Sequence, residues 1–125
     1  MEMQESGEMY LETILILSEK MDTVRAIDIV KEMGFSKPSV SRAMGILKEG
    51  KFIKISDNGE ITLTAKGKAR AEMIYERHTV IAEMLMRIGV SEQTAIDDAC
   101  RVEHYISEET FEALRRIQEK RKKNK

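Results

Sequence analysis

The sequence has 125 residues, of which 42% are hydrophobic and 34% charged, with a formal net charge of −1. This length suits one domain, or one small domain with an appended dimerisation unit, and needs no disulfides to stabilise its core. A single Cys excludes an internal disulfide, no apolar run approaches the roughly 20 residues that span a bilayer, and the acidic start is unlike a signal peptide. We therefore expect a cytoplasmic protein that binds no membrane.

Charge is distributed unevenly along the chain. Residues 24–70 hold ten Lys or Arg against five Asp or Glu, whereas residues 71–112 hold three against ten. A basic module can face phosphates and an acidic one can hold cations. We expect the first domain at residues 1–70 and the second at residues 71–125.

The N-terminal part contains three predicted helices. Residues 8–19 carry an apolar face at helical spacing, with Met9 and Glu12 beside it. Taken alone, Met9 is typical of core packing and Glu12 of a solvated charge. Two shorter helices are expected at residues 25–33 and 37–49, the second capped by Ser36, and their short Gly-containing connection predicts a helix-turn-helix. The candidates for DNA contact in its second helix are Ser36, Lys37, Pro38, Ser39, Ser41, Arg42 and Lys48.

A β-hairpin is expected directly after the second of these helices. Residues 52–55 and 60–63 are short and apolar, and the Asp57–Gly59 segment between them is a hairpin signal. A hairpin in this position makes the helix-turn-helix winged, and Lys54 and Asn58 on the wing are further candidates for contact with phosphate or the minor groove. The alternative is a helical domain with an incidental hairpin.

Helices are predicted for the rest of the chain. Residues 64–88 carry a stripe of Ile and Leu that includes His78, which is usually a satisfied core residue in such a setting. The next helix, which begins after Ser91, is expected to run through residues 97–104. It would place Cys100, Glu103 and His104 at i, i+3 and i+4 on one face. A thiolate, a carboxylate and an imidazole are three kinds of metal ligand. The alternative is a small buried Cys with two boundary residues beside it.

No segment indicates catalysis. The sequence contains no glycine-rich phosphate loop, no nucleophile elbow and no activatable nucleophile paired with a base. We expect a mainly α protein: a winged helix-turn-helix DNA-binding domain followed by an all-helical domain, and not an enzyme.

The chain resembles the iron-dependent repressor family, that of the diphtheria toxin repressor and the manganese transport regulator. The resemblance covers nearly all of the sequence and rests on three stretches, EMYLETI (8–14), SKPSVS (36–41) and DACRVEH (98–104), with TLTAKG (62–67) in support. It implies a homodimer joined through the C-terminal helices, so that this helical domain is a dimerisation domain. It also implies a divalent metal as corepressor.

The resemblance also implies which residues hold the metal. The ligands of the iron-sensing branch correspond to Met9, Cys100, Glu103 and His104, and two further ligands of the manganese-sensing branch correspond to Glu12 and His78. The sequence departs from the iron branch's other site, because Ile96 and Ala82 replace two of its ligands. The SH3-like domain of longer members has no counterpart in these 125 residues.

Together these features predict a metal-dependent transcriptional repressor that binds palindromic double-stranded operator DNA as a homodimer. Fe(II) is favoured over Mn(II), because Met9 and Cys100 are soft ligands. In this mechanism a metal held by both domains would fix the spacing of the two recognition helices. The alternatives are a metal-independent winged-helix regulator and a metal-dependent enzyme that uses the Cys100 face with His78.

Overall fold

A computed structural model describes residues 5–123 of the protein. The first residues of the acidic N-terminus and the last of the basic C-terminus lie outside this range. The chain divides into two compact units, residues 1–72 and residues 73–125, and each is described by itself. Both are mainly helical, which confirms the predicted fold class. Within residues 5–123, no helix is both long enough and apolar enough to cross a lipid bilayer.

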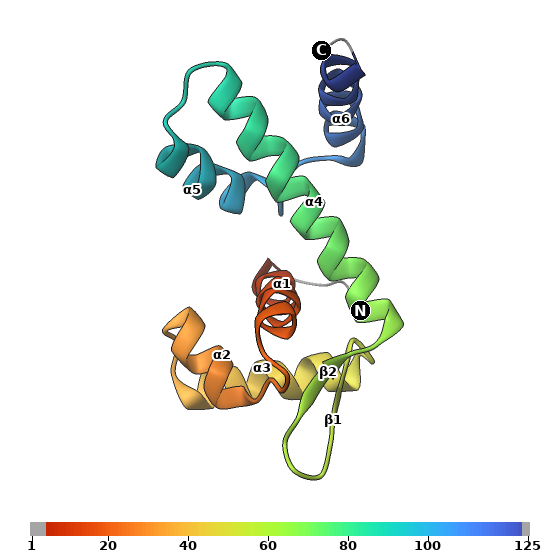
Figure 1. The fold of residues 1–125 in the computed structure, drawn as a ribbon. Coiled ribbons are helices and arrows are strands. Elements are labelled where there is room, and N and C mark those ends of the chain that lie inside the picture. The colour runs from red at the N-terminus through yellow and green to blue at the C-terminus, as the bar shows by residue number, and fades with distance from the viewer. Residues whose placement is uncertain (1–4, 124–125) are drawn as a thin grey trace. The chain divides into compact units, whose positions relative to one another are not determined.

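Unit 1, residues 1–72, begins with three helices (Figure 1), which are α1 (Glu5–Lys20), α2 (Ala26–Met33) and α3 (Lys37–Glu49). Gly34 ends α2 with a φ of 73°, a left-handed conformation that glycine adopts without strain. Ser36 caps α3, because its Oγ accepts a hydrogen bond from the Ser39 backbone N–H at 3.3 Å. These local signals explain why α3 begins where the sequence predicts.

The predicted hairpin follows α3 and consists of β1 (Ile53–Ile55) and β2 (Ile61–Leu63). The strands are antiparallel, with Lys54 opposite Thr62. Gly59 in the connection has a φ of 85°, which favours glycine at this position. The order of three helices and a hairpin is that of a winged helix-turn-helix.

The hairpin is joined tightly to the first turn of α4 (Ala65–Arg87). The Thr64 hydroxyl donates to the carbonyl of Lys51 at 2.7 Å, and it accepts from the Gly67 N–H at 3.0 Å. The Lys66 ammonium lies 4.2 Å from the centre of the Phe52 ring. A Cβ atom on Gly67 would lie 1.9 Å from the Phe52 carbonyl oxygen, so the backbones of these two residues touch. This contact leaves no room for a side chain at residue 67.

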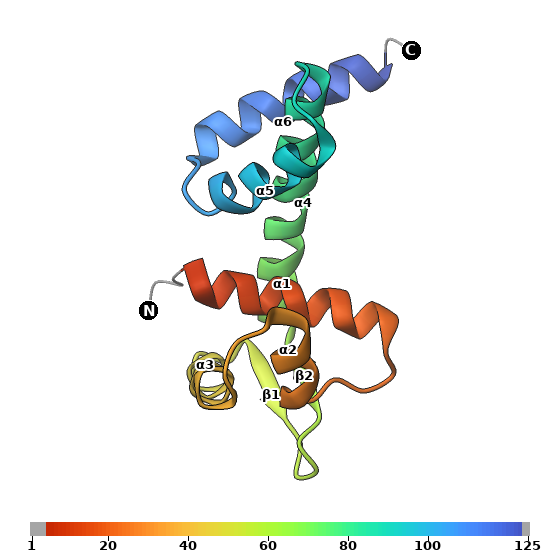
Figure 2. The same ribbon diagram turned by 90° about the vertical axis from the view of Figure 1, so that its left-hand side faces the viewer.

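The core of unit 1 lies between its helices and the hairpin. α1 packs against α2 and β2, and α3 packs against α2 and β1 (Figure 2). The buried residues of this core are Tyr10, Leu11, Ile14, Leu17, Val24, Ile29, Val40, Met44, Leu47, Phe52, Ile53, Ile61 and Ala71. Burial raises the pKa of the Tyr10 phenol. Because α3 turns Val40, Met44 and Leu47 into this core, its opposite face is left to solvent.

Unit 2, residues 73–125, holds the remainder of α4 together with α5 (Glu92–Val102) and α6 (Glu108–Lys123). Figure 1 shows α5 and α6 on opposite sides of the C-terminal half of α4. Ile81 and Ala82 of α4 and Ala99 of α5 are buried together, and Leu114 of α6 packs against them. The two alanines are the small members of this core, one on each of α4 and α5.

The prediction that one helix continues through residue 104 is wrong. α5 ends at Val102, and Glu103 and His104 lie in the turn that follows. In a continuing helix the Glu103 carbonyl would accept from the N–H of Ser107. Instead it accepts from the Arg77 guanidinium, whose Nη1 lies 3.2 Å away. A side chain of α4 therefore takes the acceptor that another helical turn would need.

The predicted apolar stripe over residues 64–88 includes Ile88, which the structure does not bury. Ile74 and Ile81 are buried, and His78 between them is partly buried. Ile88, however, lies beyond the end of α4 and is 75% exposed. The reason is that the helix has already ended at Arg87 and the chain turns at Gly89, whose φ is 106°.

Candidate metal centre and nucleic-acid interface

Three predicted metal ligands meet within unit 2. His78 comes from α4, Cys100 from α5 and Glu103 from the turn after α5. The Nδ1 atom of His78 lies 3.1 Å from Oε2 of Glu103 and 3.7 Å from Sγ of Cys100. The donor atoms of all three side chains lie within 4.8 Å of one another. We call these three residues the 78/100/103 cluster.

The Glu103 carboxylate lies between two imidazoles. While Oε2 contacts His78, Oε1 lies 3.3 Å from Nε2 of His104. The side chains of Glu103 and His104 are both only 1% exposed. A buried carboxylate is costly unless it has polar partners, and His78 supplies one through a hydrogen bond while His104 adds a second polar neighbour. His104 is therefore close to the cluster through Glu103, although it is not one of the three converging ligands.

The cluster fits a divalent transition metal by spacing and by chemistry. Metal–ligand bonds of about 2.0–2.3 Å place neighbouring donors roughly 3–4 Å apart. The distances around His78 fall in this range. A sulfur, a nitrogen and an oxygen donor disfavour Mg(II) and Ca(II) and suit Fe(II), Co(II), Ni(II) or Zn(II). Cys100 is exposed while Glu103 is buried, so the cluster has one side open to solvent.

Met9 and Glu12, the other two predicted ligands, lie on α1 in unit 1. Both side chains are partly buried beside the core-facing residues of that helix. The cluster, by contrast, belongs entirely to unit 2. The part that Met9 and Glu12 take in metal binding stays a prediction.

Ala82, one of the two residues that replace ligands of the iron branch's other metal site, has a packing role in the structure. Ala82 is 5% exposed and belongs to the core of unit 2. Its neighbour Glu83 accepts a hydrogen bond from the buried Gln118 amide of α6. Across residues 5–123, the 78/100/103 cluster is the one group of three His, Cys, Asp or Glu side chains with converging donor atoms.

The predicted DNA-contacting residues of α3 lie on one exposed surface of unit 1. Ser36 at the N-cap and Pro38 in the first turn define the N-terminal end of this helix. The candidates all remain exposed: Ser36, Lys37, Pro38, Ser39, Ser41, Arg42 and Lys48. A helix of this kind presents its N-terminal residues to base edges in the major groove. Their individual contacts stay predictions.

The wing presents its two candidates in different ways. Lys54 is exposed in the middle of β1. Asn58 lies at the hairpin connection, where its backbone carbonyl accepts from Nε of Arg25 at 3.3 Å and its side chain pairs with the Ser56 hydroxyl. The tip of the wing is thus hydrogen-bonded to the start of α2, which holds Asn58 in place.

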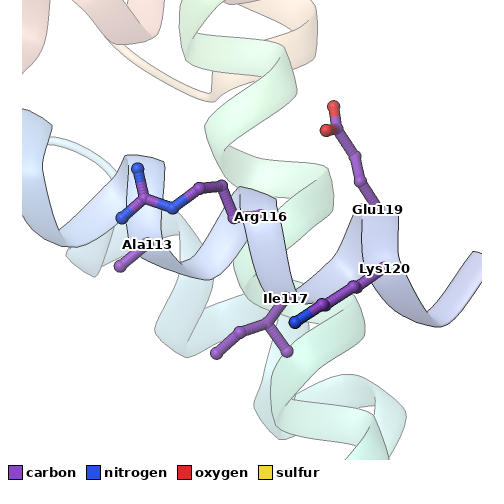
Figure 3. Close-up of a pocket in the computed structure, with 5 residues that line it drawn as sticks. All are labelled: Ala113, Arg116, Ile117, Glu119 and Lys120. Atoms are coloured by element: carbon purple, nitrogen blue, oxygen red, sulfur yellow. The ribbon is translucent and has the colours of Figure 1, made fainter.

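A surface hollow on α6 is unrelated to the metal cluster. Its lining residues, shown in Figure 3, are Ala113, Arg116, Ile117, Glu119 and Lys120. Arg116 and Lys120 bring two positive charges against the single carboxylate of Glu119, which does not suit a cation.

α6 is attached to α4 elsewhere, where the Arg115 guanidinium bonds to Glu76 at 2.9 Å. Arg115 also bonds to Glu112 and holds the pKa of that carboxyl below its usual range.

Arg77 is a site residue that sequence reasoning missed. Its guanidinium bonds to the Glu103 carbonyl and to the Glu108 carboxylate, so it contacts the turn that carries a candidate ligand. The available signal was its place directly before His78 on a helix that also carries an apolar stripe. That signal is weak, because an Arg on a long helix is ordinarily exposed.

Two family models match the chain. One is described as "Iron dependent repressor, N-terminal DNA binding domain" and matches residues 2–59. The other is described as "Iron dependent repressor, metal binding and dimerisation domain" and matches residues 64–125.

Individual relatives agree with these matches. The chain is 32% identical over 111 residues to the transcriptional regulator MntR of Escherichia coli O6:H1, covering 89% of this chain and 72% of that protein. It is 29% identical over 114 residues to the iron-dependent repressor IdeR of Mycobacterium leprae, covering 90% of this chain and 50% of that protein. A solved structure, that of the manganese regulator SloR, matches with a TM-score of 0.81 and 26% identity, covering 90% of this chain and 53% of that chain.

The chain therefore spans about half the length of two of these proteins and most of the MntR relative. The two family models lie side by side along nearly all of its residues, one over each part. The chain belongs to the iron-dependent repressor family, whose members are metal-dependent, DNA-binding transcriptional repressors and not enzymes.

Proposed function

We propose that the protein is a homodimeric repressor whose binding to a palindromic operator requires a divalent metal corepressor, with Fe(II) favoured over Mn(II). The observation that carries the proposal is the 78/100/103 cluster, in which three different metal ligands converge within 4.8 Å. The same chain carries a basic helix-turn-helix, and its DNA binding is the activity that metal occupancy would control.

In this proposal His78, Cys100 and Glu103 hold the metal in unit 2, with His104 as a further ligand. Met9 and Glu12 from α1 complete the candidate set. The metal supplies positive charge and coordination bonds to these donors. The Glu103 carboxylate oxygens lie 3.1 Å from Nδ1 of His78 and 3.3 Å from Nε2 of His104, which is close enough for these groups to share one ion, and Cys100 keeps one side of the cluster accessible.

The choice of metal rests on the ligand types of this chain. The names of the relatives point both ways, because SloR is a manganese regulator and IdeR an iron-dependent repressor. Mn(II) binds weakest in the first-row series and prefers oxygen donors. The sulfur atoms of Met9 and Cys100 therefore support Fe(II).

The exposed surfaces of the two units support operator DNA and a second subunit as partners. α3 and the wing expose Lys37, Arg42 and Lys54 for contact with DNA. Unit 2 exposes six large apolar side chains, and among them are Ile88 and Tyr105 at 75% and Val102 at 41%. Exposed apolar residues of this kind suit contact with a second copy, which would present two recognition helices to a palindrome.

A metal-independent regulator is the second candidate, and one observation favours it. The Glu103 carboxylate is already paired with two imidazoles. The Glu103 carboxylate therefore has polar neighbours on both of its oxygens in the absence of a metal.

The two candidates are separated by measuring binding to the DNA upstream of the protein's own gene by fluorescence anisotropy. The arms are chelator, anaerobic Fe(II) and Mn(II), each repeated with a scrambled DNA of equal length. We expect tight binding only with metal and only to the upstream DNA. Equal affinity for that DNA with chelator and with either metal would contradict the corepressor role and favour the metal-independent candidate.

A further inference from the structure

Arg77 holds the turn between α5 and α6 at three points. Its Nη1 donates to the carbonyl oxygens of Glu103 at 3.2 Å and Ile106 at 3.3 Å. Its Nη2 donates to Oε2 of Glu108 in the first turn of α6 at 2.8 Å. The guanidinium also lies 5.4 Å from the centre of the Phe111 ring. One side chain of α4 thus connects the end of α5 to the start of α6.

The Arg77 side chain is largely buried in addition to being hydrogen-bonded. Its side chain is 11% exposed, and its Nε is buried with no hydrogen-bond partner among the described residues. A buried donor without an acceptor costs stability, and the three bonds at Nη1 and Nη2 offset that cost. A Lys could not replace it fully, because an ammonium lacks the planar fork that reaches several acceptors in fixed directions.

Arg77 and His78 are consecutive residues, and they hold Glu103 by two different groups. Arg77 binds its backbone carbonyl at 3.2 Å, and His78 contacts its carboxylate at 3.1 Å. Fixing the backbone of a residue restricts the directions that its side chain can take. The Glu103 carboxylate can therefore point steadily at His78 although the residue lies in a turn and not in a helix.

We propose that Arg77 is a positioning residue for the metal centre and acts by holding the Glu103 backbone so that its carboxylate faces His78 and Cys100. This inference rests on the proposed function and extends it to a residue that is not itself a ligand. Outer partners that orient metal ligands typically change metal affinity by about 10- to 100-fold when they are removed.

The test is an anaerobic Co(II) titration of the full chain, followed by the absorption band of the cobalt–thiolate bond. Arg77→Gln should weaken Co(II) binding by about 10- to 100-fold. The matched control is Arg101→Gln, because that Arg follows Cys100 directly in the sequence but is 74% exposed and bonded to Asp98. The control should bind Co(II) as the parent does.

A second readout separates positioning from a general loss of stability. In the apo protein, Arg77→Gln should speed amide hydrogen exchange at residues 103–108 and leave exchange in α1 and α3 unchanged. The penalty in Co(II) affinity should also shrink in a Glu103→Gln background, because the carboxylate that Arg77 positions is then gone. Equal penalties in both backgrounds would overturn the positioning role.

The outcomes also distinguish this inference from the proposed function. If the parent binds no Co(II), the metal centre itself is refuted. If the parent binds Co(II) and Arg77→Gln binds it equally well, only the positioning role is refuted. Should Arg77→Gln fail to fold, Arg77→Lys keeps the positive charge and should still bind Co(II) several-fold more weakly than the parent, and parental affinity would overturn the inference.

Discussion

At the scale of single residues, the cluster combines one exposed and one buried ligand. The Cys100 side chain is accessible from solvent, whereas the Glu103 side chain is 1% exposed and held by two imidazoles. Removing the thiol should therefore disturb packing little, whereas removing the carboxylate would take away the acceptor that lies 3.1 Å from the partly buried His78. Cys100 is the residue at which metal binding can be tested with the least effect on folding.

We expect Cys100→Ala to weaken activation of DNA binding by Co(II) or Fe(II) by more than about tenfold, since even outer partners of a metal are worth 10- to 100-fold. Operator binding is measured during metal titration, and thermal melts of the apo proteins check folding. Asp97→Asn, an exposed neutralisation on the same helix, is the control. A Cys100→Ala protein that responds like the parent would assign Cys100 to packing and not to the metal site.

The double change Met9→Asp and Cys100→Glu should raise the response to Mn(II) relative to Co(II) or Fe(II). It replaces two soft sulfur donors with hard oxygen donors and adds negative charge, which suits Mn(II). The ratio of the half-saturating metal concentrations is the quantity to compare between parent and variant. An unchanged ratio would mean that these two side chains do not set the metal preference.

At the scale of elements, α3 and the wing present their basic residues in different settings. Arg42 lies on the exposed face of a helix whose other face is buried through Val40, Met44 and Leu47. Lys54 lies on β1, and the register places it opposite Thr62. A helix suits the reading of base edges, and a wing suits contact with the backbone or the minor groove.

Arg42→Ala should therefore weaken binding to the specific operator by about 1–3 kcal/mol if Arg42 reads a base. Lys54→Ala should instead weaken binding to all sequences alike and reduce the slope of log affinity against log salt by about one unit. Anisotropy titrations at several salt concentrations, on operator and scrambled DNA, measure both effects. If Arg42→Ala lowers both DNAs equally, Arg42 contacts phosphate and the base-reading residue lies elsewhere.

Local patterns predicted the elements well but not the partners of their side chains. Gly34, Ser36 and Pro38 lie within a few residues of one another, and they placed the start of α3. The end of α5 was predicted wrongly because it depends on Arg77, which lies 26 residues before Glu103 in the sequence. The approach of His78 to Cys100 depends likewise on how α4 packs against α5, and periodicity within one helix does not contain that information.

At the scale of the whole molecule, the protein contains two units with different tasks. The family models assign DNA binding to residues 2–59 and metal binding with dimerisation to residues 64–125. If metal occupancy raises DNA affinity, the two binding equilibria share one coupling free energy, which is typically about 1–3 kcal/mol.

Operator DNA should accordingly raise the affinity for metal by the same factor by which metal raises the affinity for operator DNA. Isothermal titration of Co(II) into the protein, with and without saturating operator, gives the first factor, and DNA titrations with and without Co(II) give the second. Scrambled DNA serves as the control. Unequal factors would show that a further equilibrium, such as dimer dissociation, contributes to the response.

The contact of Gly67 with Phe52 has a mechanical consequence. Because their backbones touch, the first turn of α4 cannot slide or tilt against the start of the wing without a clash. The hydrogen bonds of Thr64 and the stacking of Lys66 on the Phe52 ring add to this stiffness. The joint is therefore rigid, so a displacement of the first turn of α4 also displaces the start of the wing.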